Sequence, residues 1–509
     1  FSDGLEELIY RTLTRMEGNN PDMWVIPASD MKEQQVTSAR EAFDVFGANL
    51  VLQGKFSRTS QNLKLQLKLI QPNTYQILRS MDISLPVEEV THFQEKVIDA
   101  LRSLLELPVR PEQDRMQSAG LTSIGSAYQS YLEGKGLLLN YDTPSNVEQS
   151  IDLFKQAIAM DSVYALAYAG LGEAYWRKYE HTQEPHWTEE AIRYCEEALR
   201  INNYLPQVYL TLGIIRRGRG EYELSREALE NVIRVEPQNG DAYRELASTY
   251  SLMKNSSAAE KMYQKAIEHH PNYWANYYDL GRFYYHQGRY EEAVANFQKV
   301  TEIAPYNYKG FRNLGVVKLL LDDYPGARKN LEQSIAIKPN YGAYSNLGTL
   351  HFIRKEYQQA ARMFEQALEM NANFYALWGN LASCYAMLPD ESFKAAPTFQ
   401  QAINLAERQL TVNPNNSNIL KSLASYYAHL NNSAKATELI ERVLQLAGDD
   451  LDVQFRAAEV YGRLGQMDKA LNMLQQLVKK GFSRKMILQS PVFQNFQEDE
   501  RFKEALFSQ

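Results

Sequence analysis

The sequence has little of what marks membrane proteins, disulfide-rich proteins and nucleic-acid-binding proteins. Its 509 residues include two cysteines and no apolar run of about 18 residues, so no membrane-spanning helix is expected within this chain. A basic excess is also missing, since 54 Lys and Arg stand against 62 Asp and Glu, for a formal net charge of -8. Because phosphate binding needs a basic face, nucleic acid is not expected as the main partner.

The motifs of common catalytic sites are missing as well. The sequence contains no G-x-x-x-x-G-K-[ST], no H-E-x-x-H, no G-x-S-x-G and no kinase H-R-D loop. The pairs His181/His186 and His269/His270 could be metal ligands, but no cysteine or carboxylate lies at ligand spacing, so histidines of loops or helix ends are the preferred interpretation. We therefore expect no enzyme activity, no catalytic residue, no metal site and no cofactor.

The chain does contain 33 tyrosines and a repeat of about 34 residues. The copies align on the pattern aromatic-x-x-Leu-Gly/Ala-x-x-Tyr, followed by alanine, a bulky residue and alanine and then by proline, and single copies depart from it at single positions. The stretch Tyr277–Pro305 is one such copy. The small residue of the pattern recurs at spacings of 34, 34, 34, 33 and 34 residues, at Gly213, Ala247, Gly281, Gly315, Gly348 and Ala382.

This pattern predicts pairs of closely packed helices. Glycine or alanine lets two helices approach, the aromatic residue and the tyrosine share one helical face, and proline ends the second helix. The pattern resembles the tetratricopeptide repeat (TPR), a helix-turn-helix unit of 34 residues. The resemblance implies a mainly α fold, a right-handed superhelical α-solenoid of about ten repeats over residues 123–482. Residues 483–509 are expected to form capping helices that cover the last apolar face. Cys195 and Cys384 fall at packing positions, which favours free buried thiols over a disulfide.

Residues 1–110 lack this period and predict a small α/β domain. Alternation of Leu63, Leu65, Leu67 and Leu69 with polar residues indicates a half-buried strand. A polar, proline-containing linker is expected over residues 111–122. The expected elements are a helix Ser2–Met16, a strand Trp24–Pro27, a helix Asp30–Phe46, strands Leu50–Ser57, Leu63–Leu69 and Gln76–Ser84, and a helix Val87–Leu107.

The motifs FSDGLEELIYRTLTRM, WVIP and GANLVLQGKFSRTSQNLKLQLKLIQPNTYQIL resemble the TolB amino-terminal-like domain, which precedes TPR arrays in bacterial membrane serine/threonine kinases and cyclase-like regulators. SIGSAYQSYLEGKGLL and SPVFQNFQEDERFKEAL are similar to the start and end of those arrays. Members of that family begin with a strand that is missing here, so we expect a fragment whose parent continues upstream. The resemblance places this part in the periplasm or outside the cell, with the parent anchored in a membrane; a cytoplasmic location is the alternative.

The TPR resemblance also implies a binding groove. Counting the small residue as position eight, positions two, five, nine and twelve of each first helix face the groove. These residues combine arginines, which bind carboxylates, with aromatic rings. We therefore expect an extended acidic peptide or a free C-terminal carboxylate as ligand, although the same residues would line a groove without any ligand. The predicted groove residues are Trp176, Arg177, Arg217, Arg244, Tyr278, Arg282, Tyr285, His286, Lys309 and Arg312.

Position six adds a second candidate feature, since Asn313, Asn346 and Asn380 occupy it in successive repeats. They resemble the asparagine ladder of the TPR superhelix in O-linked N-acetylglucosamine transferase, which holds peptide backbone. An asparagine side chain both donates and accepts hydrogen bonds, but Asn-Leu-Gly is also common in the repeat consensus. The sequence thus predicts a non-enzymatic scaffold or sensor module that binds a protein or peptide. The alternative is the regulatory region of a membrane serine/threonine kinase or cyclase-like regulator.

Overall fold

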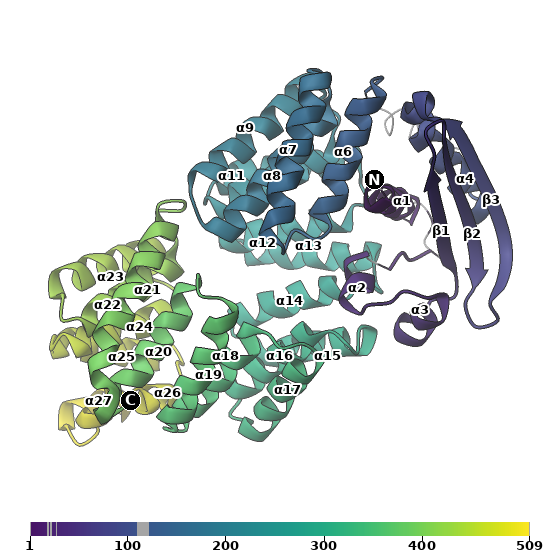
Figure 1. Ribbon diagram of the computed structural model, residues 1–509. Coiled ribbons are helices and arrows are strands. Elements are labelled where there is room, and N and C mark those ends of the chain that lie inside the picture. The colour runs from purple at the N-terminus through teal and green to yellow at the C-terminus, as the bar shows by residue number, and fades with distance from the viewer. Residues whose placement is uncertain (1, 18–19, 21–22, 27, 109–121, 508–509) are drawn as a thin grey trace. The chain divides into compact units, whose positions relative to one another are not determined.

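A computed structural model describes residues 2–17, 20, 23–26, 28–108 and 122–507 (Figure 1). The predicted fold class is confirmed: the chain is mainly α, with consecutive helix pairs preceded by a three-stranded antiparallel sheet. It divides into two compact units, each described by itself below. Unit 1 comprises residues 1–287 and 302–306, and unit 2 comprises residues 288–301 and 307–509. Within the described residues, no helix has the length and apolar character needed to cross a membrane.

Unit 1 begins with a mixed group of helices and strands. The sheet has the order β1-β2-β3, so β2 is central and pairs antiparallel with both neighbours. Its elements are α1 (Ser2–Glu17), α2 (Ala28–Glu33), α3 (Ala39–Phe46), β1 (Val51–Arg58), β2 (Asn62–Gln71), β3 (Gln76–Pro86), the 3-10 helix η1 (Val87–His92) and α4 (Phe93–Leu105).

The alternation predicted for the central strand is confirmed. Leu63, Leu65, Leu67 and Leu69 of β2 are buried, while the lysines between them are exposed or half-buried. The leucines Leu63, Leu65 and Leu67 join a core that includes Val97 of α4. Figure 1 shows α4 next to the sheet. Burial of the leucine face therefore positions α4 on the sheet.

Two predictions in this region are wrong. Residues 24–26 form no strand, and the helix predicted over Asp30–Phe46 is two helices. Ser38 starts α3 with a capping box: its hydroxyl accepts from the Glu41 amide at 3.2 Å, and the Glu41 carboxylate accepts from the Ser38 amide at 3.0 Å. This S-x-x-E signal, visible in the sequence, begins α3. Helix α2 has already ended at Glu33, and Gln35 after it has a left-handed backbone conformation (φ 53°). The predicted linker 111–122 lies outside the described residues except for Thr122.

Among the described residues ten helix pairs follow, and they are numbered repeats one to ten. The boundary between the two units passes through repeat five. The pairs are α6 (Gly125–Leu138) with α7 (Pro144–Met160), α8 (Ala165–Thr182) with α9 (His186–Ile201), α10 (Pro206–Gly218) with α11 (Tyr222–Val235), α12 (Gly240–Leu252) with α13 (Ser256–His269), α14 (Trp274–His286) with α15 (Tyr290–Ile303), α16 (Tyr308–Leu320) with α17 (Tyr324–Ile337), α18 (Tyr341–Ile353) with α19 (Tyr357–Met370), α20 (Tyr375–Ala386) with α21 (Ala395–Leu410) after the 3-10 helix η2 (Pro389–Lys394), α22 (Ser417–His429) with α23 (Ser433–Ala447), and α24 (Leu451–Arg463) with α25 (Met467–Lys479).

The small residue at position eight allows the close helix contact that the sequence predicts. A Cβ placed on Gly213 would lie 2.7 Å from Cγ of Leu229, and one on Gly315 would lie 2.6 Å from Cγ of Leu331. The second helices also end where the prolines require: α11 ends two residues before Pro237. A small residue is therefore needed at position eight, and in these two repeats it has to be glycine, because a Cβ would force the helices of the pair apart.

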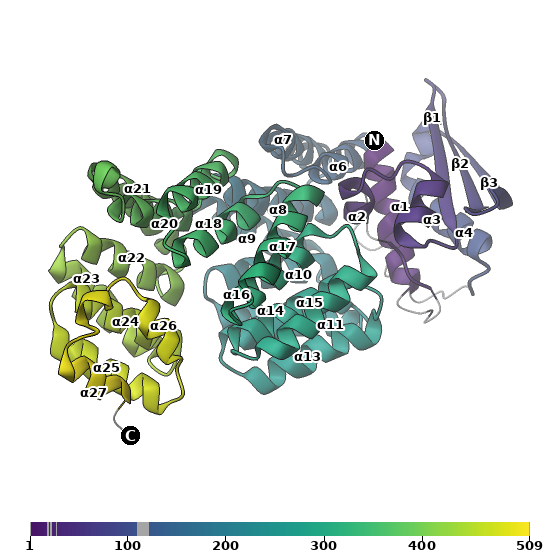
Figure 2. The ribbon, with the colours of Figure 1, turned by 90° about the horizontal axis from the view of Figure 1, so that it is seen from below.

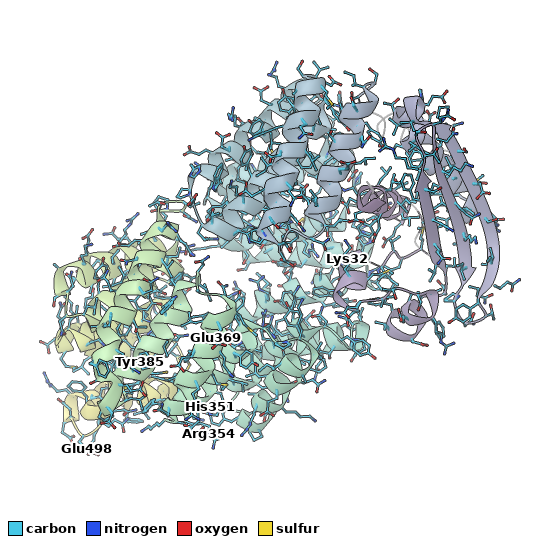
Figure 3. The ribbon with its side chains drawn as sticks, in the orientation of Figure 1. Lys32, His351, Arg354, Glu369, Tyr385 and Glu498 are labelled. Atoms are coloured by element: carbon cyan, nitrogen blue, oxygen red, sulfur yellow. The ribbon has the colours of Figure 1, made fainter. Side chains whose placement is uncertain are left out.

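Hydrogen bonds from tyrosine to glutamate connect successive repeats. Tyr385 of α20, labelled in Figure 3, donates to the Glu365 carboxylate of the preceding α19 at 2.8 Å, and Tyr284 donates to Glu260 in the same way at 2.8 Å. These bonds explain part of the high tyrosine content. Figure 3 also shows His351 beside Arg354 at the end of α18, where Nδ1 of His351 lies 2.6 Å from Glu356.

Unit 2 ends with three short elements that pack on its last repeat: α26 (Arg484–Gln489), the 3-10 helix η3 (Gln494–Phe496) and α27 (Glu500–Phe507). Phe493 and Phe502 are buried against the same core as Leu474 of α25. These residues cover apolar surface of the helix pair α24 and α25. On α26, Nζ of Lys485 lies 2.6 Å from the Asp322 carboxylate.

Candidate functional site

The predicted site residues all lie on first helices of the pairs, and they divide between the two units. Eight lie in unit 1, on α8, α10, α12 and α14: Trp176, Arg177, Arg217, Arg244, Tyr278, Arg282, Tyr285 and His286. Five lie in unit 2, on α16, α18 and α20: Lys309, Arg312, Asn313, Asn346 and Asn380.

In unit 1 the arginines of repeats three and four face carboxylates of the next repeat. Arg217 of α10 lies 2.5 Å from the Glu245 carboxylate of α12. Arg244 of α12 lies 3.2 Å from Asp279 of α14 and 2.9 Å from Asp241. Arg244 is 13% exposed, so the pair lies largely away from water. These contacts form a ladder of ion pairs from one first helix to the next.

A further pair of this kind connects repeats one and two. Nζ of Lys135 on α6 lies 2.7 Å from the Glu173 carboxylate on α8. Burial works against ionisation of Glu173, but Lys135, Arg11 and Arg177 together lower its pKa to about 2. Arg177 in addition binds Glu180 at 2.8 Å and lies over the Tyr141 ring at 3.9 Å. The predicted Arg177 thus belongs to a charge cluster inside unit 1.

The aromatic residues predicted for unit 1 pack against their own neighbours. Tyr278 meets Trp274 edge-to-face at 5.8 Å, and the Arg282 guanidinium lies 5.9 Å from the Tyr278 ring. The rings of Tyr285 and His286 are 5.0 Å apart. On α8, the rings of Trp176 and Tyr179 are 5.1 Å apart between centroids. A Cβ placed on Gly218 would lie 3.0 Å from the Trp176 ring. The groups that the sequence assigned to a ligand have intramolecular partners here.

The sequence reasoning missed the acidic partners. Glu245 and Asp279 both occupy position six of their first helices, and both face an arginine of the preceding repeat. Burial raises the pKa of Asp279 despite the opposing effect of Arg244. Counting position six along the array, as was done for the asparagines, would have identified both. Their presence balances the basic charge that was expected on this part of the array.

In unit 2 position six carries the three asparagines, called here the asparagine row. Neighbouring first helices α16, α18 and α20 pack side by side. Asn313 accepts from Nε of Arg312 at 3.4 Å. Asn346 is half-buried, Asn380 is exposed, and neither side chain bonds to any other described residue. Nζ of Lys309 lies 5.7 Å from the Tyr308 ring. The row therefore offers amide donors and acceptors to an incoming molecule.

Sequence profiles of the tetratricopeptide repeat match this helical region in five places. The matched segments are residues 210–250, 240–273, 262–295, 342–372 and 452–480. The helical part of the chain is a TPR array. The matches include α12 and α14 of unit 1 and α18 of unit 2, each of which carries predicted site residues. Helices α8, α16 and α20 lie outside the matched segments, and their position numbers rest on the spacing of the small residues.

Two curated proteins illustrate what the array is similar to. The type IV pilus assembly protein PilF of Pseudomonas aeruginosa is 27% identical over 134 residues, which are 26% of this chain and 53% of that protein. The small glutamine-rich tetratricopeptide repeat-containing protein 2 of Saccharomyces cerevisiae is 31% identical over 118 residues, 23% of this chain and 32% of that protein. The chain thus spans about half the length of the first relative and about a third of the second.

Among solved structures, a tetratricopeptide repeat protein from Parabacteroides merdae is similar. Its identity is 16%, it covers 50% of this chain and 99% of its own, and the TM-score is 0.41. These likenesses concern the repeats, and they assign no partner to this chain.

Proposed function

We propose that this chain is a non-enzymatic protein-binding scaffold, and that the asparagine row of unit 2 holds the backbone of an extended peptide. The TPR array supports the first part, because stacked repeats present long binding surfaces. The second part rests on one observation: three amide side chains recur at position six of adjacent first helices. An extended peptide presents an N–H and a C=O at regular intervals, and an asparagine can bind both.

The ligand that we propose is acidic or carries a free C-terminal carboxylate. Lys309 and Arg312 lie on α16 beside the start of the row and supply positive charge there. The preference for an acidic ligand rests on the charge of these two side chains and on their place next to Asn313 on the same helix. A peptide that orders on binding loses conformational entropy, and we expect an affinity near the micromolar range.

Peptide selection followed by binding measurements tests the proposal. Random peptides of about twelve residues with free C-termini would be selected on the full chain, and their affinities measured against Asn346→Ala with Asn380→Ala. Each lost amide contact should cost about 1 kcal/mol, so the double variant should lose about tenfold or more for every peptide, whatever its sequence. Asn404→Ala on the second helix α21 is the matched control. Unchanged affinity in the double variant would remove the row from the site.

The charge preference has its own measurement. Arg312→Glu should weaken acidic peptides and leave neutral ones unaffected, and the effect should diminish in high salt. Equal loss for both kinds of peptide would contradict the preference for acidic ligands while leaving backbone recognition intact.

The TolB-like resemblance of residues 1–110 and the role as a regulatory region of a membrane kinase or cyclase-like regulator stay predictions. The sequence of the gene upstream of residue 1 tests both, because the resemblance implies a membrane span and a catalytic domain in that direction.

A further inference from the structure

In unit 1 the N-terminal helix α1 packs on the first helices of the repeats. The crossing of α1 and α6 is very close, because glycines lie on both sides of it. A Cβ on Gly4 of α1 would collide with the carbonyl oxygen of Leu132, and one on Gly136 of α6 would lie 2.8 Å from the Gly4 nitrogen. Figure 2 shows α1 beside α6. Backbone-to-backbone contact of this kind requires small residues at one place on each helix.

The apolar stripe of α1 is buried by this contact together with α4, which also packs on α1. Leu5 and Met16 are 2% and 7% exposed, and they belong to the same core as Leu132 of α6 and Leu166 of α8. Leu8 and Leu13 pack at its margin. The spacing of these residues is that of one helical face. The first helices therefore bind α1 as an amphipathic helix.

Three polar contacts anchor the segment to repeats two, four and five. Arg11 lies near enough to Glu173 to be among the cations that lower the pKa of that carboxyl. The Glu17 carboxylate lies 2.8 Å from Nδ1 of His270 at the end of α13. Further along, Nε1 of Trp274 donates to the Asp30 carboxylate at 2.6 Å. The anchors follow α1 and α2 across the array and fix the direction of the segment.

A pocket of about 70 Å³ lies at the junction of α1, α4 and the repeats. Leu8 of α1, Gln94 of α4 and Leu166 and Gln207 of the repeats are among its lining residues, and the pocket is partly open to solvent.

We propose that the first helices of repeats one to five form a helix-binding surface, which α1 and α2 occupy in cis and which an amphipathic helix of a partner protein occupies by displacing them. The partner helix carries the pattern of α1: a small residue at the crossing, a cation seven residues later for Glu173 and a carboxylate thirteen residues later for His270. This surface lies in unit 1 and its occupation does not depend on the asparagine row.

The two glycines of the crossing give a matched test, since one belongs to the bound helix and the other to the surface. The probe is a fluorescein-labelled peptide of residues 2–33, titrated into the full chain. Gly4→Leu should release α1 and leave the surface intact, so that this variant binds the probe at least tenfold more tightly than the unaltered chain. Gly136→Leu should also release α1 but obstruct the surface, and it should bind no probe. A probe carrying Gly4→Leu should bind neither chain.

A second kind of variant shows whether the effect of Gly4→Leu comes from release of α1 or from misfolding. Glu17→Gln combined with Asp30→Asn weakens two anchors without adding volume, and it too should bind the probe more tightly than the unaltered chain. Equal probe affinity of the unaltered chain, Gly4→Leu and this variant would overturn the proposal. Dimers of Gly4→Leu in light scattering would also overturn it, because the occupant would then be α1 of a second copy.

Discussion

Position six of the first helices carries carboxylates in repeats four and five of unit 1 and amides in repeats six to eight of unit 2. Glu245 and Asp279 of repeats four and five each face an arginine of the preceding repeat. Asn346 and Asn380 of repeats seven and eight bond to no other described residue. Side chains at position six thus connect successive repeats in unit 1, whereas in unit 2 they remain accessible to a ligand. In a TPR array the helix pattern fixes where a side chain lies, and its chemistry decides what it binds.

The buried ion pairs of unit 1 should give the largest effect. Lys135 is 7% exposed and lies 2.7 Å from Glu173. Lys135→Met keeps the aliphatic chain but removes the charge, and Glu173, which is 27% exposed, then has Arg11 and Arg177 as its remaining cations. We expect a loss of about 3 kcal/mol in unfolding free energy, because removing one partner of a largely buried ion pair is costly. Chemical denaturation measures the loss, and hydrogen exchange should place it in α6 and α8. A loss below about 1 kcal/mol would show that the ladder contributes little.

Helix packing at position eight should be nearly as sensitive, and in unit 2 it can be tested without touching the asparagine row. Gly315→Leu places side-chain atoms against Leu331, and overpacking of this kind should cost about 2–3 kcal/mol. Gly54→Ala on β1 is the control, since its Cβ would meet ordinary contacts at 3.7 Å. Thermal denaturation compares the two. An unchanged melting temperature for Gly315→Leu would mean that the register of unit 2 is wrong.

The two units should respond oppositely to pH. In unit 2, burial together with Arg463 and Arg456 lowers the pKa of His429 to about 3. As the pH falls, His429 therefore becomes protonated in the unfolded chain while it stays neutral in the folded chain, which favours unfolding. The free energy of unfolding of unit 2 should fall by about 2 kcal/mol between pH 7 and pH 5. His429→Gln should remove most of that slope in denaturation curves recorded at each pH. If the unfolding free energy of the variant changed with pH as steeply as that of the unaltered chain, groups other than His429 would be responsible for the pH dependence.

His270 of unit 1 provides the contrast. Burial opposes its protonation, but the hydrogen bond to Glu17 prevails and raises its pKa. Protonated His270 therefore stabilises the folded unit at pH values below the ordinary histidine pKa. This stabilisation is lost as the pH rises through the raised pKa. The same low pH that weakens unit 2 through His429 thus favours the contact between α1 and repeat four.

Exchanging the position-six chemistry tests the comparison directly. Asp279→Asn makes position six of unit 1 resemble that of unit 2. It should lower the free energy of unfolding by about 1–2 kcal/mol, because Arg244 loses its ion pair to Asp279 and retains the one to Asp241. Asn346→Asp makes the opposite change and should alter stability by less than about 0.5 kcal/mol, while weakening acidic peptides through repulsion. Denaturation and peptide titration on both variants measure the two effects. Equal stability changes would show that position six has one role throughout.

Much of the fold was predictable from the sequence because it depends on local rules. The 34-residue spacing of small residues located the helix pairs, and the alternating leucines located β2. The errors have local causes as well. The capping box at Ser38 was overlooked, so one helix was expected where α2 and α3 form. Residues 24–26 read as a strand from composition alone, but no neighbouring strand pairs with them among the described residues.

The site was less predictable because it depends on which side chains face each other across repeats. The arginines were placed on the correct helices, but their partners Glu245 and Asp279 lie about 30 residues away in the sequence. The role of α1 could not be derived either. Its amphipathic pattern indicates a helix with one buried face, and only the structure shows that the first helices of the array cover that face.

The smallest effect is expected at an ion pair of nearly the same length in unit 2. Nζ of Lys485 lies 2.6 Å from Asp322, but Lys485 is 52% and Asp322 45% exposed. Water screens such a pair and competes for both groups. Lys485→Met should therefore leave the melting temperature of unit 2 unchanged within error, at low and at high salt. A clear destabilisation would mean that contact distance, rather than burial, sets the strength of these pairs, and the distinction drawn for Lys135 would fail with it.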